Sequence, residues 1–162
     1  MALVTSTPAA DASAKLTDVH LCCKGCVTGA EKAVGEVDGA KAEVDQDAGT
    51  VTLSAPDAAT LRKAEDALVK AGYFGKSSDS SLSLDSSTGA KGDKVQSLRV
   101  EGVHLCCGKC VKAVDRAVKA VPGAKEHTAT KGAKVFEVTG DFNDQEFFTA
   151  LQKEGLTGKV AK

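Results

Sequence analysis

The sequence contains the stretch Val19-His20-Leu21-Cys22-Cys23-Lys24-Gly25-Cys26, and it returns 84 positions later as Val103-His104-Leu105-Cys106-Cys107-Gly108-Lys109-Cys110. These two copies hold all six cysteines of the chain. Between residues 19–41 and 103–125, 13 of 23 positions are identical. A repeat this close indicates that the 162 residues arose by duplication of one domain.

The residues that follow each copy have the periodicity of an amphipathic helix. Apolar side chains recur there at intervals of three and four residues, which places them on one face of a helix. They are Val27, Ala30, Val34 and Val37 in the first half, and Val111, Val114, Val118 and Val121 in the second. Asp38-Gly39 and Pro122-Gly123 are expected to end these two helices.

Segments of alternating apolar and polar residues predict the strands. In the first half the expected strands are 15–21, 41–45, 50–54 and 73–76, with a second helix that starts at Ser54-Ala55-Pro56-Asp57 and ends at Gly72. In the second half, strands are expected through Leu98 and Val100, through Phe136 and Val138, and over 157–160, and Asp141 is expected to cap the second helix. The first half therefore has the order β-α-β-β-α-β, and we expect the second half, as its repeat, to have the same order.

These elements divide the chain into a flexible tail (1–14), a first domain (15–76), a linker (77–93) and a second domain (94–162). The linker contains seven serines, a composition typical of flexible connections. A strand through Leu82 and Leu84 is the less favoured alternative. Each domain is near the lower size limit for a single apolar core, so a bound metal would add stability.

Composition excludes several classes of function. The formal charge is −1 and the chain has no Trp and one Tyr, so nucleic-acid binding is not expected. No apolar run reaches the roughly 20 residues that span a bilayer, so no membrane insertion is expected. Residues 1–14 lack the basic and apolar parts of a secretory signal. The compartment stays open between the cytoplasm and an exported or periplasmic location with the signal missing from this chain.

The cysteines favour ligand or redox chemistry over structural disulfides, because adjacent thiols in one loop are poor cross-links between distant segments. Cys26 and Cys110 fall in the first turn of a predicted helix, and Cys23 and Cys107 lie just before it. A helix N-terminus stabilises thiolates. Thiolates select soft or borderline ions such as Cu(I), Zn(II), Hg(II) and Cd(II). Mg(II) and Ca(II) are not expected, since no carboxylates cluster with the thiols.

A C-x-x-C between the first strand and first helix of a β-α-β-β-α-β unit, with Gly72-Tyr73 after the second helix, resembles the heavy-metal-associated (HMA) domain. Val100-Glu101-Gly102 is also similar to the approach to that family's metal loop. The resemblance covers nearly the whole of both halves. It implies an α+β fold of two tandem ferredoxin-like βαββαβ sandwiches. It also implies Cys23 and Cys26, then Cys107 and Cys110, as the metal ligands.

The loops differ from the family pattern Gly-Met-x-Cys-x-x-Cys. With the cysteines aligned, Leu21 and Leu105 replace the methionine, and both loops add a cysteine and a histidine. The added residues are Cys22, Cys106, His20 and His104. They turn a two-thiol site into a Cys₃ or Cys₃His site, which would also suit Zn(II). Tyr73 is matched by Leu156, so the two sites are expected to differ.

We therefore expect a non-enzymatic protein that binds one soft ion per domain, with Cu(I) favoured and Zn(II) the runner-up, for metal transfer, sequestration or detoxification. The implied partners are another metal-transfer protein or a metal-transporting ATPase, and the chain is expected to be a monomer or a metal-bridged dimer. One ion bridged between the two loops is also conceivable, because the linker is long enough to let them meet. The alternatives are a thiol-disulfide redox protein that uses the C-x-x-C pairs and a zinc-stapled protein-interaction module.

Overall fold

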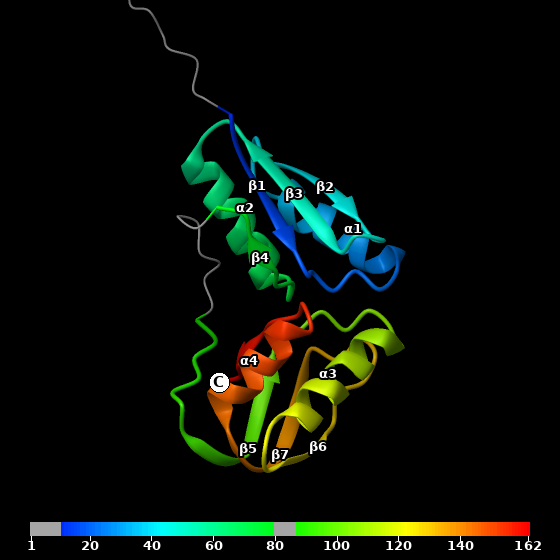
Figure 1. Cartoon of the computed structure of the whole chain (residues 1–162), viewed down its shortest axis with the longest axis vertical. Helices are drawn as coiled ribbons and strands as arrows, with labels where there is room; N and C mark the ends of the chain where they lie inside the picture. The colour runs from blue at the N-terminus through cyan, green and yellow to red at the C-terminus, as the bar shows by residue number, and fades with distance from the viewer. Residues whose placement is uncertain (1–10, 80–86) are drawn as a thin grey trace, which may run out of the picture.

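The computed structural model describes residues 11–79 and 87–162, which form two α+β domains (Figure 1). Each domain has one four-stranded antiparallel sheet, with strand orders β2-β3-β1-β4 and β6-β7-β5-β8. Two helices pack against each sheet. This order is that of a ferredoxin-like βαββαβ sandwich, so the predicted fold class is confirmed in both halves.

In the first domain the second and third strands form a hairpin, and the first strand lies between that hairpin and the short last strand. The elements are β1 (Ala12–Thr17), α1 (Lys24–Gly35), β2 (Lys41–Asp45), β3 (Thr50–Ala55), α2 (Ala58–Lys70) and β4 (Lys76–Ser77). The core lies between the sheet and helices, where side chains such as Leu16, Leu53 and Leu68 are almost completely buried. Burial alternates along β3, as the sequence pattern predicts.

The second domain repeats this arrangement with a more aromatic core. Its elements are β5 (Lys94–Glu101), α3 (Gly108–Ala120), β6 (Ala124–His127), β7 (Val135–Asn143), α4 (Asp144–Lys153) and β8 (Lys159–Val160). Phe147 from α4 packs edge-to-face against Phe136 and Phe142 of β7. Phe148 occupies the same helical face. Each domain thus has its own apolar core.

Several elements differ from the sequence expectation. β1 ends at Thr17, four residues before the predicted end, because Asp18 has a left-handed backbone (φ 60°). Asp141 does not cap α4: it lies inside β7, and Asn143 is the cap, whose side chain accepts hydrogen bonds from the N–H groups of Gln145 and Glu146. The strand considered through Leu82 and Leu84 lies outside the described residues.

The C-terminal part of the predicted linker is tied to the second domain. The carboxylate of Asp144, at the start of α4, accepts hydrogen bonds from the N–H groups of Lys91 and Gly92 at 3.0 and 2.9 Å. The carbonyl of Thr88 accepts from the N–H of Val160 in β8 at 2.8 Å. The described part of this segment therefore belongs physically to the surface of the second domain.

The two domains meet through matching segments of the two halves. Tyr73 and Leu156, both expected in or beside closing strands, instead form an isolated antiparallel bridge with each other. The N–H of Thr157 donates to the carbonyl of Gly72 at 2.9 Å, and the carbonyl of Gly155 accepts from the N–H groups of His20 and Phe74. These contacts bring the loop before α1 to face the loop before α3 (Figure 1).

Candidate metal centre

The cysteines lie where the first helix of each domain begins. Cys23 and Cys107 are the N-cap residues of α1 and α3, with extended backbones, and Cys26 and Cys110 lie in the first turns. The side chains of Cys26 and Cys110 are completely buried and start the apolar face of each helix. Both helix N-termini, with their partial positive charge, thus point toward sulfur.

All six thiols converge on one cluster and none is in a disulfide. Within the first loop, Cys26 Sγ lies 3.5 Å from Cys22 Sγ and 4.0 Å from Cys23 Sγ. The corresponding distances in the second loop, from Cys110 to Cys106 and Cys107, are 3.7 and 3.9 Å. The contacts between loops are equally short: Cys22–Cys107 3.2 Å, Cys22–Cys110 3.6 Å, Cys23–Cys106 3.5 Å and Cys26–Cys106 3.4 Å. The structure thus joins the two predicted loops into one group of sulfur atoms.

The cluster contains two overlapping sets of four sulfur atoms that could hold a metal ion. One set is Cys22, Cys23, Cys26 and Cys106, and the other is Cys22, Cys106, Cys107 and Cys110. In each set the ligand atoms all lie within 4.8 Å of one another. Each set takes three sulfurs from one loop and one from the other. Cys22 and Cys106, the cysteines that depart from the C-x-x-C pattern, belong to both sets.

The thiols differ in how readily they ionise. The backbone N–H of Cys26 lowers the pKa of Cys23. At Cys107 burial acts in the opposite direction, but the N–H of Cys110 and the Cys22 thiol outweigh it and the pKa is lowered. Burial raises the pKa of Cys22 to about 12 and raises that of Cys106 as well. The two N-cap thiols are therefore the first to become thiolates, and thiolates are the species that bind metal.

The two histidines of the repeated motif have different surroundings. The ring of His104 stacks on Tyr73 of the other domain with centroids 4.6 Å apart, and its Nε2 lies 3.1 Å from the Tyr73 hydroxyl. That hydroxyl donates to the carbonyl of Cys26 at 2.8 Å. Burial, and then the charge of His20, lower the pKa of His104. His20 Nε2 is buried and has no hydrogen-bond partner among the described residues.

This difference agrees with the expectation that the exchange of Tyr73 for Leu156 makes the two halves unequal, because Leu156 has no hydroxyl to offer. Neither histidine belongs to the four-sulfur sets, which contain cysteines alone. A ligand role for His20 and His104 stays a prediction. The sequence comparison matched Tyr73 with Leu156, but no signal in the sequence indicated the contact of Tyr73 with His104 across the interface.

Lys109, in the first turn of α3, reaches across the interface. Its Nζ donates to the carbonyl of Cys22 at 3.4 Å. It thereby links the second loop to the first and places a cation beside the cluster.

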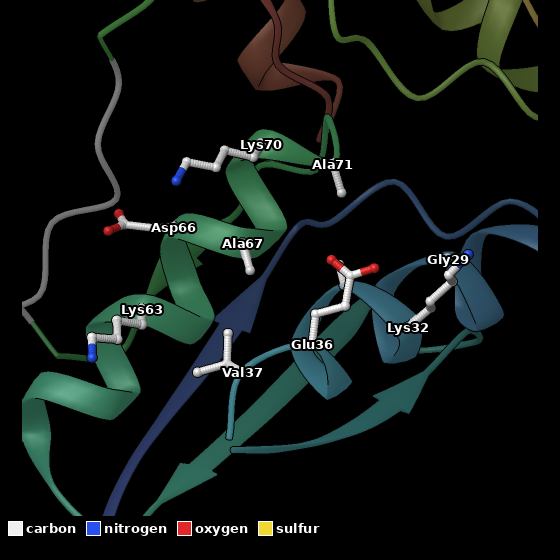
Figure 2. Close-up of a pocket in the computed structure, with 10 residues that line it drawn as sticks. Gly29, Lys32, Glu36, Val37, Lys63, Asp66, Ala67, Lys70 and Ala71 are labelled. Carbon is white, nitrogen blue, oxygen red and sulfur yellow. The ribbon is translucent and has the colours of Figure 1, made fainter. Parts of the chain in front are cut away.

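A separate groove of about 540 Å³ lies between α1 and α2. Figure 2 shows Lys32 and Glu36 of α1 on one side and Ala67 and Lys70 of α2 on the other. None of the described residues that line it is a cysteine or histidine. The groove is therefore distinct from the candidate metal centre.

Comparison with known proteins adds little to the fold described above. No protein-family model matches the chain, and no curated protein matches it. Among solved structures, the chain is similar to the N-terminal soluble domains of Bacillus subtilis CopA, at 13% identity, with 96% of this chain and 97% of that chain covered and a TM-score of 0.34. Because that score is low, the fold assignment depends on the strand order of each domain. Among the helices within residues 11–79 and 87–162, none combines the length and the apolar composition of a membrane span.

Proposed function

We propose that this protein binds soft metal ions through its six clustered cysteines. The observation that supports the proposal is the convergence of six free thiols on two helix N-termini, with sulfur atoms 3.2–4.0 Å apart. Four sulfur ligands about 2.3 Å from a tetrahedral ion lie about 3.8 Å apart. The cluster therefore has the spacing that a thiolate-bound ion requires with little rearrangement.

Cu(I) is the favoured ion and Zn(II) the runner-up, because the centre offers sulfur without carboxylates. The role we propose is metal transfer, sequestration or detoxification, without catalysis. Cys23 and Cys107 are partly exposed, whereas Cys26 and Cys110 are buried. An incoming thiolate from a metal-transfer protein or a metal-transporting ATPase would join the ion at the exposed side while one of the N-cap thiolates leaves.

The test is competition for Cu(I) and for Zn(II) against chromophoric chelators under a non-thiol reductant, with bound metal counted by native mass spectrometry. We expect metal retention by the wild type and a large loss of affinity when Cys23, Cys26, Cys107 and Cys110 are all replaced by serine. Circular dichroism of the same variant checks that the fold persists. A folded variant with unchanged affinity for both ions would exclude the proposal.

A thiol-disulfide redox function is the second candidate, and one observation favours it. The Cys23 thiol has a lowered pKa and is partly exposed, and its Sγ lies 4.0 Å from the buried Cys26. An exposed thiolate beside a second thiol is the arrangement that attacks a disulfide and then resolves the mixed disulfide. Catalytic turnover in an insulin-reduction assay without retained metal would favour this function over metal binding.

A further inference from the structure

The proposed function leaves open how many ions the cluster holds and which sulfurs each ion shares. In the structure, the two three-cysteine loops are not separate, because sulfur atoms of one loop contact those of the other. The shortest sulfur contact, Cys22–Cys107 at 3.2 Å, joins the two loops and is shorter than the 4.0 Å between Cys23 and Cys26 in one loop. Neither loop supplies a complete four-sulfur set by itself.

We infer that the two loops form one binuclear thiolate centre within a single chain, in which Cys22 and Cys106 each bridge both ions. This inference rests on the proposed function. The first ion takes Cys23 and Cys26 as terminal ligands, and the second takes Cys107 and Cys110. Each thiol that binds gives its proton to solvent. Cys106 is then the fourth ligand of the ion held by the first loop, and Cys22 is the fourth ligand of the ion held by the second loop.

Distances within both sets agree with this assignment. Four of the six sulfur–sulfur distances in the first set are 3.5, 4.0, 3.5 and 3.4 Å. Those of the second are 3.2, 3.6, 3.7 and 3.9 Å. Both ranges lie close to the edge of about 3.8 Å expected for four thiolates around one tetrahedral ion. The cluster can thus hold two ions, one in each four-sulfur set.

Local positive charge can compensate a cluster that holds two divalent ions. Six thiolates with two divalent ions carry a residual charge of −2. The N-termini of α1 and α3 each contribute about half a positive charge. Lys109 Nζ lies close enough to bond the carbonyl of Cys22. These groups can balance the residual charge.

Cadmium-113 NMR of the full-length protein tests the assignment, with Cd(II) as the probe because it takes sulfur ligands. The β-protons of a cysteine couple to each cadmium nucleus that its sulfur binds. At saturation we expect two cadmium signals from one chain. We expect the β-protons of Cys22 and Cys106 to correlate with both signals, and those of the other four cysteines with one signal each.

Cys22→Ser and Cys23→Ser provide a matched pair, because the two residues are neighbours in one loop and both are half-buried. Cys22→Ser is expected to shift both cadmium signals, and Cys23→Ser to shift chiefly one. Circular dichroism checks the fold, and the wild-type correlations decide the question even if a variant unfolds.

The other outcomes distinguish failure of the bridged centre from failure of metal binding itself. If two ions bind but each cysteine correlates with a single signal, the bridged centre is wrong and metal binding stands. One cadmium per chain at saturation, or two chains holding the ions together by native mass spectrometry, also overturns the inference. If neither Cd(II), Cu(I) nor Zn(II) is retained, the proposed function itself fails.

Discussion

Replacing Gly72 with alanine should separate the two domains while leaving each of them folded. Gly72 has a left-handed backbone (φ +92°), and a Cβ there would lie 2.3 Å from the backbone nitrogen of His104 and 2.5 Å from the carbonyl oxygen of Gly102. Both atoms belong to the other domain and are backbone, so no side chain can rotate away. The strain can be released only if the domains move apart.

The size of the effect follows from these distances. Ordinary contact begins near 3.4 Å, so the difference from 2.3 Å requires the backbones to move apart by about 1.1 Å. Such a shift would break the 2.9 Å bond from Thr157 N–H to the Gly72 carbonyl and the two bonds to the Gly155 carbonyl. With about 1 kcal/mol for each of three bonds, the ratio of closed to open protein should fall roughly 100-fold.

Tyr73 is the only tyrosine in a chain without tryptophan, so its fluorescence reports the interface directly. Its side chain is 1% exposed in the closed arrangement. In Gly72→Ala we expect acrylamide to quench this fluorescence much more strongly. Small-angle scattering should show a larger radius of gyration. Far-UV circular dichroism should be unchanged, since neither sheet is altered.

Gly132→Ala is the matched control. Gly132 also has a left-handed backbone (φ +78°), but a Cβ there meets nothing within 4 Å. Both variants therefore carry the cost of about 1–2 kcal/mol for a left-handed alanine, and only Gly72→Ala carries the clash between domains. Equal acrylamide quenching and equal radii of gyration in the two variants would refute the reasoning.

Three further predictions concern single groups. Tyr73→Phe should cost about 1–3 kcal/mol in urea unfolding, because the Cys26 carbonyl and His104 Nε2 lose the hydroxyl; an unchanged midpoint would contradict this. Burial raises the pKa of Glu65 from 4.5 to about 7, so the folded state binds more protons between these values and stability falls as pH rises through that window. Glu65→Gln should therefore stabilise the protein by about 3 kcal/mol at pH 8 and hardly at all at pH 4 in chemical unfolding; equal gains at both pH values would contradict it. Because burial raises the pKa of Cys22 to about 12, metal binding must displace its proton, and apparent affinity in chelator competition should increase from pH 6 to pH 8; a flat profile would show that no proton is released.

The second helices of the two halves differ in the side chains that they bury, and the helical period alone did not predict this difference. The buried face of α2 consists of Leu61, Ala64, Glu65 and Leu68, and that of α4 consists of Asp144, Phe147, Phe148 and Leu151. At equal spacing, Glu65 thus stands where Phe148 stands in the second domain. The helical period predicts which positions face the core, but the neighbours in space determine whether a carboxyl group can be buried there.

The sequence by itself determined the duplication, the order of strands and helices in each half, and the placement of the thiols at two helix N-termini. These features follow from short-range rules: helical and strand periods, capping residues, and a repeated motif. It also indicated the chemistry proposed for the loops, since sulfur ligands favour soft ions. The C-terminal end of β1 and the cap of α4 were misplaced, because φ of Asp18 and the local bonds of Asn143 decide them.

Only the tertiary structure decided that the two loops form one cluster. The contacts that bring them together are backbone hydrogen bonds at Gly72 and Gly155 and the bridge between Tyr73 and Leu156. Backbone groups are common to all residues and glycine adds no side chain, so these contacts leave no periodic signal in the sequence. Whether Cys22 faces its own loop or also the other depends on how two rigid domains are placed, and that placement is set by packing between segments more than 80 residues apart.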